Sequence, residues 1–261
     1  MNKWRSAPRL KKLTFQISHP IQLNKNKMIN KKVLFVVTST AEVPATGEKT
    51  GLWIEEWSTP YYLLTAQGFL VTTASPKGGI APIDPKSTLP DFTTDSVRKF
   101  FDDRAAMQQL NETIALKDID PEAFEAVFYP GGNGPMWDLP SNKDSIRIIE
   151  NFHRAGKVVA LVCHAPAALE NTCGPDGEPL VKGVKVTSYS QNEDTASQNQ
   201  GNVPYSLQNM LKEKGGIYVQ GENWHPFAVN DGGLITGQNP ASSQLVAQMI
   251  AERLTTVTTP H

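Results

Sequence analysis

The sequence predicts a doubly wound α/β fold, in which a mostly parallel sheet is covered by helices on both faces. Short apolar runs rich in β-branched residues alternate with longer segments of helical periodicity. The strand-like runs are apolar throughout, as is typical of strands buried on both faces. No internal repeat or linker divides the chain after residue 32, and 261 residues suffice for one large domain. We therefore predict a single α/β domain over 32–261, preceded by a leader at 1–31.

The first half of the chain contains three expected strands and two expected helices. Strands are predicted at 32–39, 69–75 and 121–132, and helices at 51–68 and 93–109. Pro60 should bend or interrupt the first helix, because proline lacks an N–H and clashes with the preceding turn. The segment 76–91 is too rich in Gly and Pro for regular structure and is expected to be an ordered excursion.

The second half continues the alternation. Strands are predicted at 157–162 and 183–190, a hairpin at 227–237, and helices at 141–155, from about 164, at 205–216 and at 239–254. Ser141 is a suitable N-cap for the first of these helices, and Gly156 is expected to end it. The sequence "NDGG" provides the turn of the hairpin.

The charge is distributed unevenly. Residues 1–32 carry nine of the 25 basic residues and none of the 26 acidic ones. We expect a basic, disordered leader, with Met28 as a natural start; a transit peptide is the alternative. The acidic remainder is a poor match for nucleic acid, and no apolar run approaches the roughly 18 residues of a membrane span. Two cysteines exclude a disulfide framework and indicate a reducing, cytoplasmic location.

The segment "VVALVCHAPAAL" (158–169) leads an apolar strand pattern into Cys163 and His164 and then into a helical pattern. In doubly wound sheets, ligands bind at the carboxyl ends of strands, where Cys163 should lie. A helix beginning at this turn would lower the pKa of the thiol and produce an exposed, easily oxidised thiolate. His164 would be its proton-transfer partner. The alternative is a buried structural cysteine, which is how free Cys often occurs.

Four stretches carry a resemblance to a known family. "ALVCHAPAAL" resembles the cysteine turn of the ThiJ/PfpI superfamily, whose members are related to class I glutamine amidotransferase domains. The stretches 50–79, "VFYPGGNGPMWDLP" and "LITGQNPASS" resemble its branch of heat-shock chaperones and glutathione-independent glyoxalases (glyoxalase III). The resemblance covers about residues 32–254 and implies a flavodoxin-like sheet.

The resemblance also implies roles for individual residues. Cys163 falls on the nucleophile, His164 on the neighbouring proton-transfer residue, and Glu56 on the buried acid beside the thiol. The acid that orients the histidine falls on Asp194, with Glu193 as the alternative. Adjacent helical residues point about 100° apart, so only Glu56 of the pair "EE" is expected to face the cysteine, and Glu55 is expected to be solvated.

The glycine-rich stretch "GGNG" implies a substrate-binding or oxyanion site. We expect the backbone N–H groups of Gly132 and His164 to stabilise an oxyanion, since glycine allows close approach of the backbone. The chain departs from the family pattern at Asn133, where many relatives have His, and at Ala165, where Gly is common. A proton relay through residue 133 is therefore in doubt.

The resemblance implies conversion of methylglyoxal to lactate without glutathione. We expect a small 2-oxoaldehyde substrate, no cofactor, no metal site and a homodimer, with no nucleic acid or membrane as partner. Two alternatives are a stress-related holdase chaperone and a cysteine amidase or peptidase of the same superfamily. Chaperone activity should survive loss of Cys163, whereas glyoxalase activity and amidase or peptidase activity should not.

Overall fold

The computed structural model describes residues 30–199 and 201–256, so nearly all of the predicted leader at 1–31 lies outside the described residues. A seven-stranded sheet forms the centre in the order β3-β2-β1-β4-β5-β9-β8. Its strands are β1 Lys32–Val36, β2 Leu70–Ser75, β3 Ile114–Ala115, β4 Ala126–Tyr129, β5 Val158–Val162, β8 Ala228–Asp231 and β9 Leu234–Gly237. All neighbours are parallel except β8 and β9, which pair antiparallel.

This sheet confirms the predicted fold class. Strands β2-β1-β4-β5-β9 follow the flavodoxin-like order, which reverses direction between β1 and β4. Chain crossovers leave on opposite faces at such a point, and ligands bind beside it at the carboxyl ends of the strands. A separate pair of short parallel strands, β6 Lys185–Val186 and β7 Ile217–Tyr218, lies outside the main sheet.

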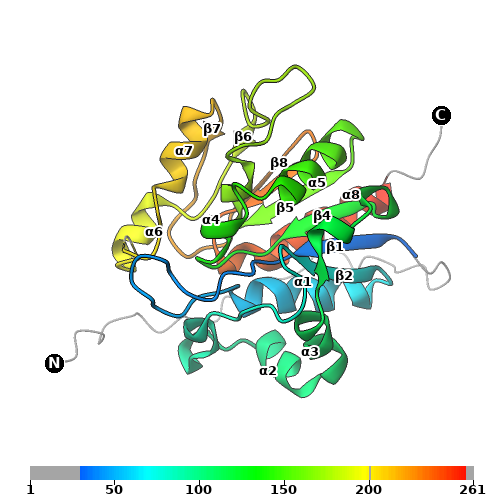
Figure 1. The fold of residues 1–261 in the computed structure, drawn as a ribbon, viewed down its shortest axis with the longest axis vertical. Helices are drawn as coiled ribbons and strands as arrows, with labels where there is room; N and C mark the ends of the chain where they lie inside the picture. The colour runs from blue at the N-terminus through cyan, green and yellow to red at the C-terminus, as the bar shows by residue number, and fades with distance from the viewer. Residues whose placement is uncertain (1–29, 200, 257–261) are drawn as a thin grey trace, which may run out of the picture.

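Helices cover both faces of the sheet (Figure 1). They are α1 Ile54–Ala66, α2 Asp95–Asp102, α3 Arg104–Asn111, α4 Pro135–Asp138, α5 Lys143–Arg154, α6 Gln191–Ala196, α7 Leu207–Glu213 and α8 Ser243–Thr256. Apolar side chains of α1, α2, α3 and α8 join one core cluster, and those of α4, α5 and α7 join the other.

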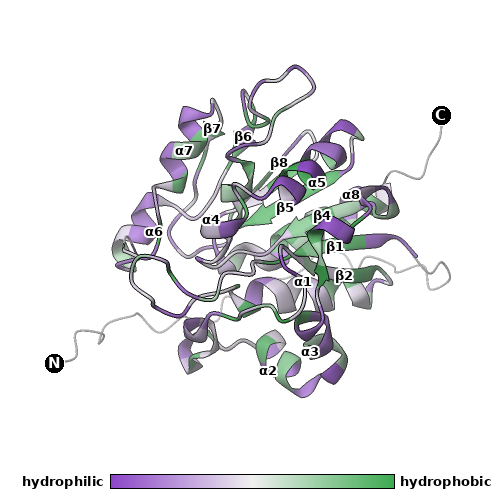
Figure 2. Cartoon of the chain, in the orientation of Figure 1, coloured by the Kyte–Doolittle hydropathy of each residue, from purple (hydrophilic) through white to green (hydrophobic). Residues whose placement is uncertain are grey.

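Strand β1 shows how the sequence produces this three-layer packing. Leu34 and Val36 belong to one core cluster, whereas Val33 and Phe35 belong to the other. Side chains alternate between the faces of a strand, so a strand in the middle of three layers must be apolar at every position. Figure 2 shows hydrophobic central strands and hydrophilic outer stretches on α5 and α7.

Three helix predictions need correction. α1 runs without interruption through Pro60, which is buried within it, because packing against α8 and the sheet retains the helical path. The expected helix 93–109 is two helices, because Asp103 breaks the first and caps α3 by accepting from the N–H groups of Ala105 and Ala106. Asn142, rather than Ser141, caps α5, while Gly156 ends it at a φ of 64° as predicted.

Two further differences lie near the predicted site. The segment after Cys163 is a short 3₁₀ helix, Ala165–Leu169, instead of an α-helix. The expected strand 183–190 is reduced to β6, after which the chain turns back towards Cys163 through a hydrogen bond from the Tyr189 N–H to the Cys163 carbonyl (2.7 Å).

Candidate active site

Cys163 lies at the carboxyl end of β5 in a strained backbone conformation. Its φ is 60°, in the left-handed region that residues other than glycine rarely adopt. The Cys163 N–H donates to the Gly237 carbonyl of β9 at 2.9 Å, and its own carbonyl accepts from Tyr189. Strain of this kind persists only where the surroundings fix it, and it concentrates at functional sites.

The thiol itself differs from the sequence-based expectation. Cys163 is only 4% exposed, so the prediction of an exposed thiolate is wrong. Burial and the neighbouring Glu56 carboxyl raise the pKa of the Cys163 thiol, whereas a hydrogen bond from the Gly132 N–H opposes the rise. The α-helix that was expected to lower this pKa is replaced by the short 3₁₀ helix Ala165–Leu169.

Glu56 lies in the first turn of α1 and is fully buried. Its Oε2 accepts a hydrogen bond from the Gly131 N–H at 2.6 Å. Burial raises the pKa of Glu56 to about 8, although the bond from Gly131 and an interaction with the Cys163 thiol lower it in part. The two groups act on each other: the thiol lowers the Glu56 pKa in part, while the carboxyl raises the pKa of the thiol. Among the described residues, Glu56 Oε1 has no hydrogen-bond partner. At neutral pH the carboxyl is therefore mostly protonated.

Glu55 is not the solvated acid that the sequence predicts. It is half-buried, and burial raises its pKa to about 7. Adjacent positions on α1 nevertheless separate the two carboxyls, since only Glu56 interacts with the thiol and with Gly131.

Two glycines allow the backbone after β4 to approach the thiol. A Cβ on Gly131 would lie 2.8 Å from Glu56 Oε2 and 2.9 Å from Cys163 Cβ. Gly132 has a φ of 95°, and its N–H is directed at the sulfur. Within the described residues, the N–H of His164 donates to no backbone or side-chain oxygen. The Gly132 N–H therefore lies beside the thiol, and the oxyanion role of both predicted donors stays a prediction.

His164 connects the thiol to a buried carboxylate. Its Nδ1 lies 3.4 Å from Cys163 Sγ, and its Nε2 lies 3.1 Å from Asp194 Oδ1. The imidazole and Asp194 are each 3% exposed. The ring of Tyr189 packs against the imidazole with 4.5 Å between centroids. An N–H on Nε2 leaves the Nδ1 lone pair facing the thiol, as proton transfer requires.

Glu193, the alternative to Asp194, is bonded to other groups than His164. Its carboxylate accepts five hydrogen bonds, from the N–H and hydroxyl of Ser190, the N–H of Trp224 and the side-chain amides of Gln238 and Asn239. These donors come from three separate segments of the chain. Glu193 thus ties the loops around the site together, while the next residue, Asp194, contacts the histidine.

Among the described residues, the side chain of Asn133 is bonded to an amide and not to the thiol. Its side chain exchanges hydrogen bonds with Asn199, and Asn199 also donates to Asp194. The sequence analysis did not identify Asn199 or Tyr189, because neither has a motif of its own. Ala165 is fully buried in the 3₁₀ turn. The structure brings Cys163 together with Glu56, Gly132, His164 and Asp194, whose roles remain predictions.

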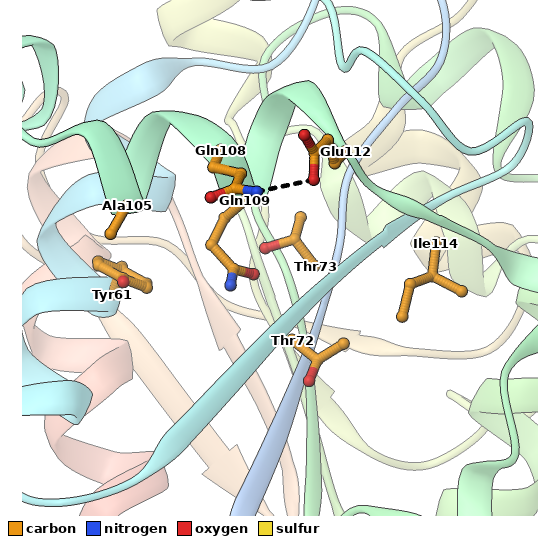
Figure 3. Close-up of a pocket in the computed structure, with 8 residues that line it drawn as sticks. All are labelled: Tyr61, Thr72, Thr73, Ala105, Gln108, Gln109, Glu112 and Ile114. Carbon is orange, nitrogen blue, oxygen red and sulfur yellow. Dashed lines mark hydrogen bonds between the residues drawn. The ribbon is translucent and has the colours of Figure 1, made fainter.

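A separate pocket lies away from the Cys163 cluster. This pocket of about 410 Å³ opens between α1, α3, the edge strand β3 and its neighbour β2 (Figure 3). Polar side chains line much of it, including Thr72, Gln109 and Glu112. It shares no residue with the Cys163 cluster. Juxtaposed reactive groups, rather than cavity volume, therefore identify the candidate site.

The described part of the chain has neither a metal-binding cluster nor a membrane-spanning helix. Residues 30–199 and 201–256 contain no group of three or more His, Cys, Asp or Glu side chains that could hold a metal ion. Within the same ranges, no helix has both the length and the apolar character to cross a membrane.

The fold and the cluster define an α/β protein with a buried cysteine at a strand-to-turn junction, a His–Asp pair and a buried carboxyl. The chain belongs to the DJ-1/PfpI family, whose model matches residues 51–253. This confirms the resemblance inferred from the sequence.

Named relatives refine this placement. The chain is 32% identical over 230 residues to "Glyoxalase 3" of Candida albicans, covering 83% of this chain and 95% of the relative. It is 29% identical over 231 residues to "Glutathione-independent glyoxalase HSP31" of Saccharomyces cerevisiae, covering 84% and 96%. The crystal structure of glyoxalase III from Candida albicans superimposes with a TM-score of 0.78 at 30% identity, covering 86% of this chain and 97% of that one. These similarities support a glyoxalase III-type enzyme acting on a small aldehyde.

Proposed function

We propose that this protein is a glutathione-independent glyoxalase that converts methylglyoxal and water to lactate. One observation carries the proposal: the Cys163 thiol lies between a buried, mostly protonated carboxyl and a His–Asp pair. An aldehyde bound here would meet a nucleophile, a proton shuttle and the backbone N–H of Gly132. The names of the relatives in Candida albicans and Saccharomyces cerevisiae support the same reaction.

In the first step, the Cys163 sulfur adds to the aldehyde carbon, C1. A C–S bond forms as the carbonyl π bond breaks. His164 Nδ1, 3.4 Å from Sγ, accepts the thiol proton and delivers it to the new alkoxide. Asp194 stabilises the transient imidazolium through its bond to Nε2. The product is a neutral hemithioacetal.

In the second step, Glu56 moves a proton between adjacent carbons. Its carboxylate form removes the C1 proton, and the resulting enediolate is stabilised by the N–H groups of Gly132 and His164. The hydroxyl proton moves from O1 to O2, and Glu56 returns its proton to C2, leaving a lactoyl thioester on Cys163. A pKa of about 8 populates both forms of Glu56 near neutral pH, as general acid–base catalysis requires.

In the last step, water hydrolyses the thioester. Water adds to the acyl carbon, the C–S bond breaks, and one proton returns to sulfur. Lactic acid leaves and the thiol is regenerated. The net change is the addition of one water molecule to methylglyoxal, so no redox partner is needed.

We also propose a homodimeric state and a cytoplasmic location. The small number of cysteines in the sequence supports the location, since thiols persist in reducing compartments. Membership of a family that includes dimers motivates the proposal of a homodimer. Sedimentation of the purified chain would test it.

Lactate formation by wild type, Cys163→Ala and Cys173→Ala tests the function. Cys173 is a matched control because it is free and exposed and lies outside the site. We expect wild type and Cys173→Ala to turn over methylglyoxal equally and Cys163→Ala to form no lactate above background. Equal lactate from Cys163→Ala, or none from wild type, would overturn the proposal. If wild type forms no lactate, suppression of client aggregation by both wild type and Cys163→Ala would identify a holdase, and Cys163-dependent peptide hydrolysis a peptidase.

A further inference from the structure

Asn133 and Asn199 form a reciprocal pair of side-chain amides across the site. Asn133 Nδ2 donates to Asn199 Oδ1 at 2.8 Å, and Asn199 Nδ2 donates to Asn133 Oδ1 at 3.0 Å. Asn133 follows the glycines after β4, and Asn199 follows α6. Two hydrogen bonds between planar groups restrict both side chains more strongly than one bond would.

Asn199 is also bound to Asp194 in two ways. Its Nδ2 donates to Asp194 Oδ1 at 2.9 Å, and its backbone N–H donates to the Asp194 carbonyl at 2.9 Å. A carboxylate oxygen only accepts, so the Asn199 NH₂ group must face Asp194, and its carbonyl oxygen must face Asn133. The two N–H groups of this NH₂ are thereby used, one for Asp194 and one for Asn133.

Asp194 Oδ1 consequently receives two donors, Asn199 Nδ2 and His164 Nε2. The bond from Asn199 fixes the direction of this oxygen, and the bond from His164 joins the oxygen to the imidazole. An acceptor fixed at Nε2 keeps the proton on that nitrogen and leaves the Nδ1 lone pair towards Cys163 Sγ, 3.4 Å away.

We propose that the Asn133–Asn199 amide pair is a positioning device that fixes Asp194 and thereby selects the reactive tautomer of His164. Asn133 therefore has a structural use at the position where the family pattern suggested a proton relay. The pair also joins the Gly132 donor, one residue before Asn133, to the loop that carries the acid. The Gly132 N–H and the Asp194 carboxylate are thus held at a fixed distance from each other.

The test compares Asn199→Ala, Asn133→Ala and the double variant. The tautomer of His164 is read from the ¹⁵N shifts of the labelled imidazole, assigned by the signal lost in His164→Gln. Methylglyoxal turnover provides kcat and KM. In Asn199→Ala we expect a mixture of tautomers and a kcat lowered about tenfold with KM nearly unchanged, since one hydrogen bond to a charged group is lost.

The remaining variants sharpen the result. Asn133→Ala should have a smaller effect in the same direction, and the double variant should equal Asn199→Ala because Asn133 acts only through Asn199. Asn151→Ala, which loses a side-chain bond to the Arg147 carbonyl within α5, is the control and should change neither readout. If Asn199→Ala does not fold, Asn133→Ala carries the same test.

An unchanged tautomer and kcat in Asn199→Ala, or in Asn133→Ala where that is the test variant, would overturn the positioning role. Only the kinetic readout rests on the proposed function. A wild type without methylglyoxal turnover would refute that function, while the imidazole shifts would still decide whether the amide pair selects the tautomer.

Discussion

Two buried glutamates near Cys163 differ in how their carboxyls are bonded. Glu56 and Glu193 are both fully buried. Glu193 accepts five hydrogen bonds from three loop segments. Glu56 accepts one from the Gly131 backbone, and among the described residues its other oxygen has no partner.

The difference separates a residue that holds structure from one that can hold a movable proton. The donors around Glu193 replace the water it loses on burial, so its carboxylate connects loops at little cost. Glu56 lacks such replacement, and its pKa rises to about 8. An undersatisfied carboxyl beside a thiol is costly for stability and useful for proton transfer.

The largest expected effect is on turnover by Glu56→Gln. The amide retains the shape and can accept from Gly131, but it cannot carry a proton between carbons. We expect kcat/KM for methylglyoxal to fall about 10³-fold, within the range for loss of a general acid–base group. Glu55→Gln, one residue earlier on α1, is the matched control and should stay within about threefold of wild type. A comparable loss in Glu55→Gln would mean that the two carboxyls share the role.

Glu193→Gln should mainly affect folding. The amide NH₂ would face N–H and O–H donors that need an acceptor, so buried polar groups are left unpaired. We expect the free energy of unfolding to fall by about 3 kcal/mol in urea titrations. The exposed Glu252→Gln should change it by less than about 0.5 kcal/mol. Stability equal to wild type would contradict the role assigned to Glu193.

The pH dependence of stability should follow Glu56. Its pKa is raised from 4.5 to about 8 in the folded protein, so between these pH values the folded state binds the extra proton. Stability from this group is therefore greatest below about pH 4.5 and is lost as pH rises towards 8. The contribution is on the order of 2 kcal/mol, discounted for relaxation of the buried site. Unfolding titrations at pH 6 and pH 8 should show a smaller decline in Glu56→Gln than in wild type, and equal declines would refute the assignment.

The smallest effect is expected from Ser190→Ala. Ser190 caps α6 and also donates its hydroxyl to Glu193 at 2.8 Å. Ser206 caps α7 without contacting Glu193. We expect unfolding free energies lower by about 1.5 kcal/mol for Ser190→Ala and about 0.5 kcal/mol for Ser206→Ala. Equal losses would show that the Glu193 network adds nothing to the cap.

The sequence predicted the long central strands better than the short strands and the helix boundaries. Continuous apolar runs located β1, β4 and β5, since a strand buried on both faces leaves that pattern. Two-residue strands such as β3 and β6 are too short to show any periodicity. The break at Asp103 depended on one capping side chain within an otherwise helical pattern.

Within the site, motifs located Cys163, His164 and Glu56, but they did not predict the raised pKa of the Cys163 thiol. The choice between Asp194 and Glu193 depended on which way two adjacent side chains turn on α6. The raised pKa of Cys163 depends on burial by segments distant in sequence. Asn199 enters the site after Gln198, whose φ of 56° reverses the chain, and no sequence pattern encodes that contact.

The close approach of Glu56 and Cys163 depends on the absence of a side chain at Gly131. A methyl group there would meet the Val162 carbonyl at 2.6 Å as well as the Glu56 carboxyl and the Cys163 side chain. Any side chain at residue 131 would force the acid and the thiol apart. A relative with another residue at this position would therefore not form the present site, even if it retained the cysteine, the histidine and both acids.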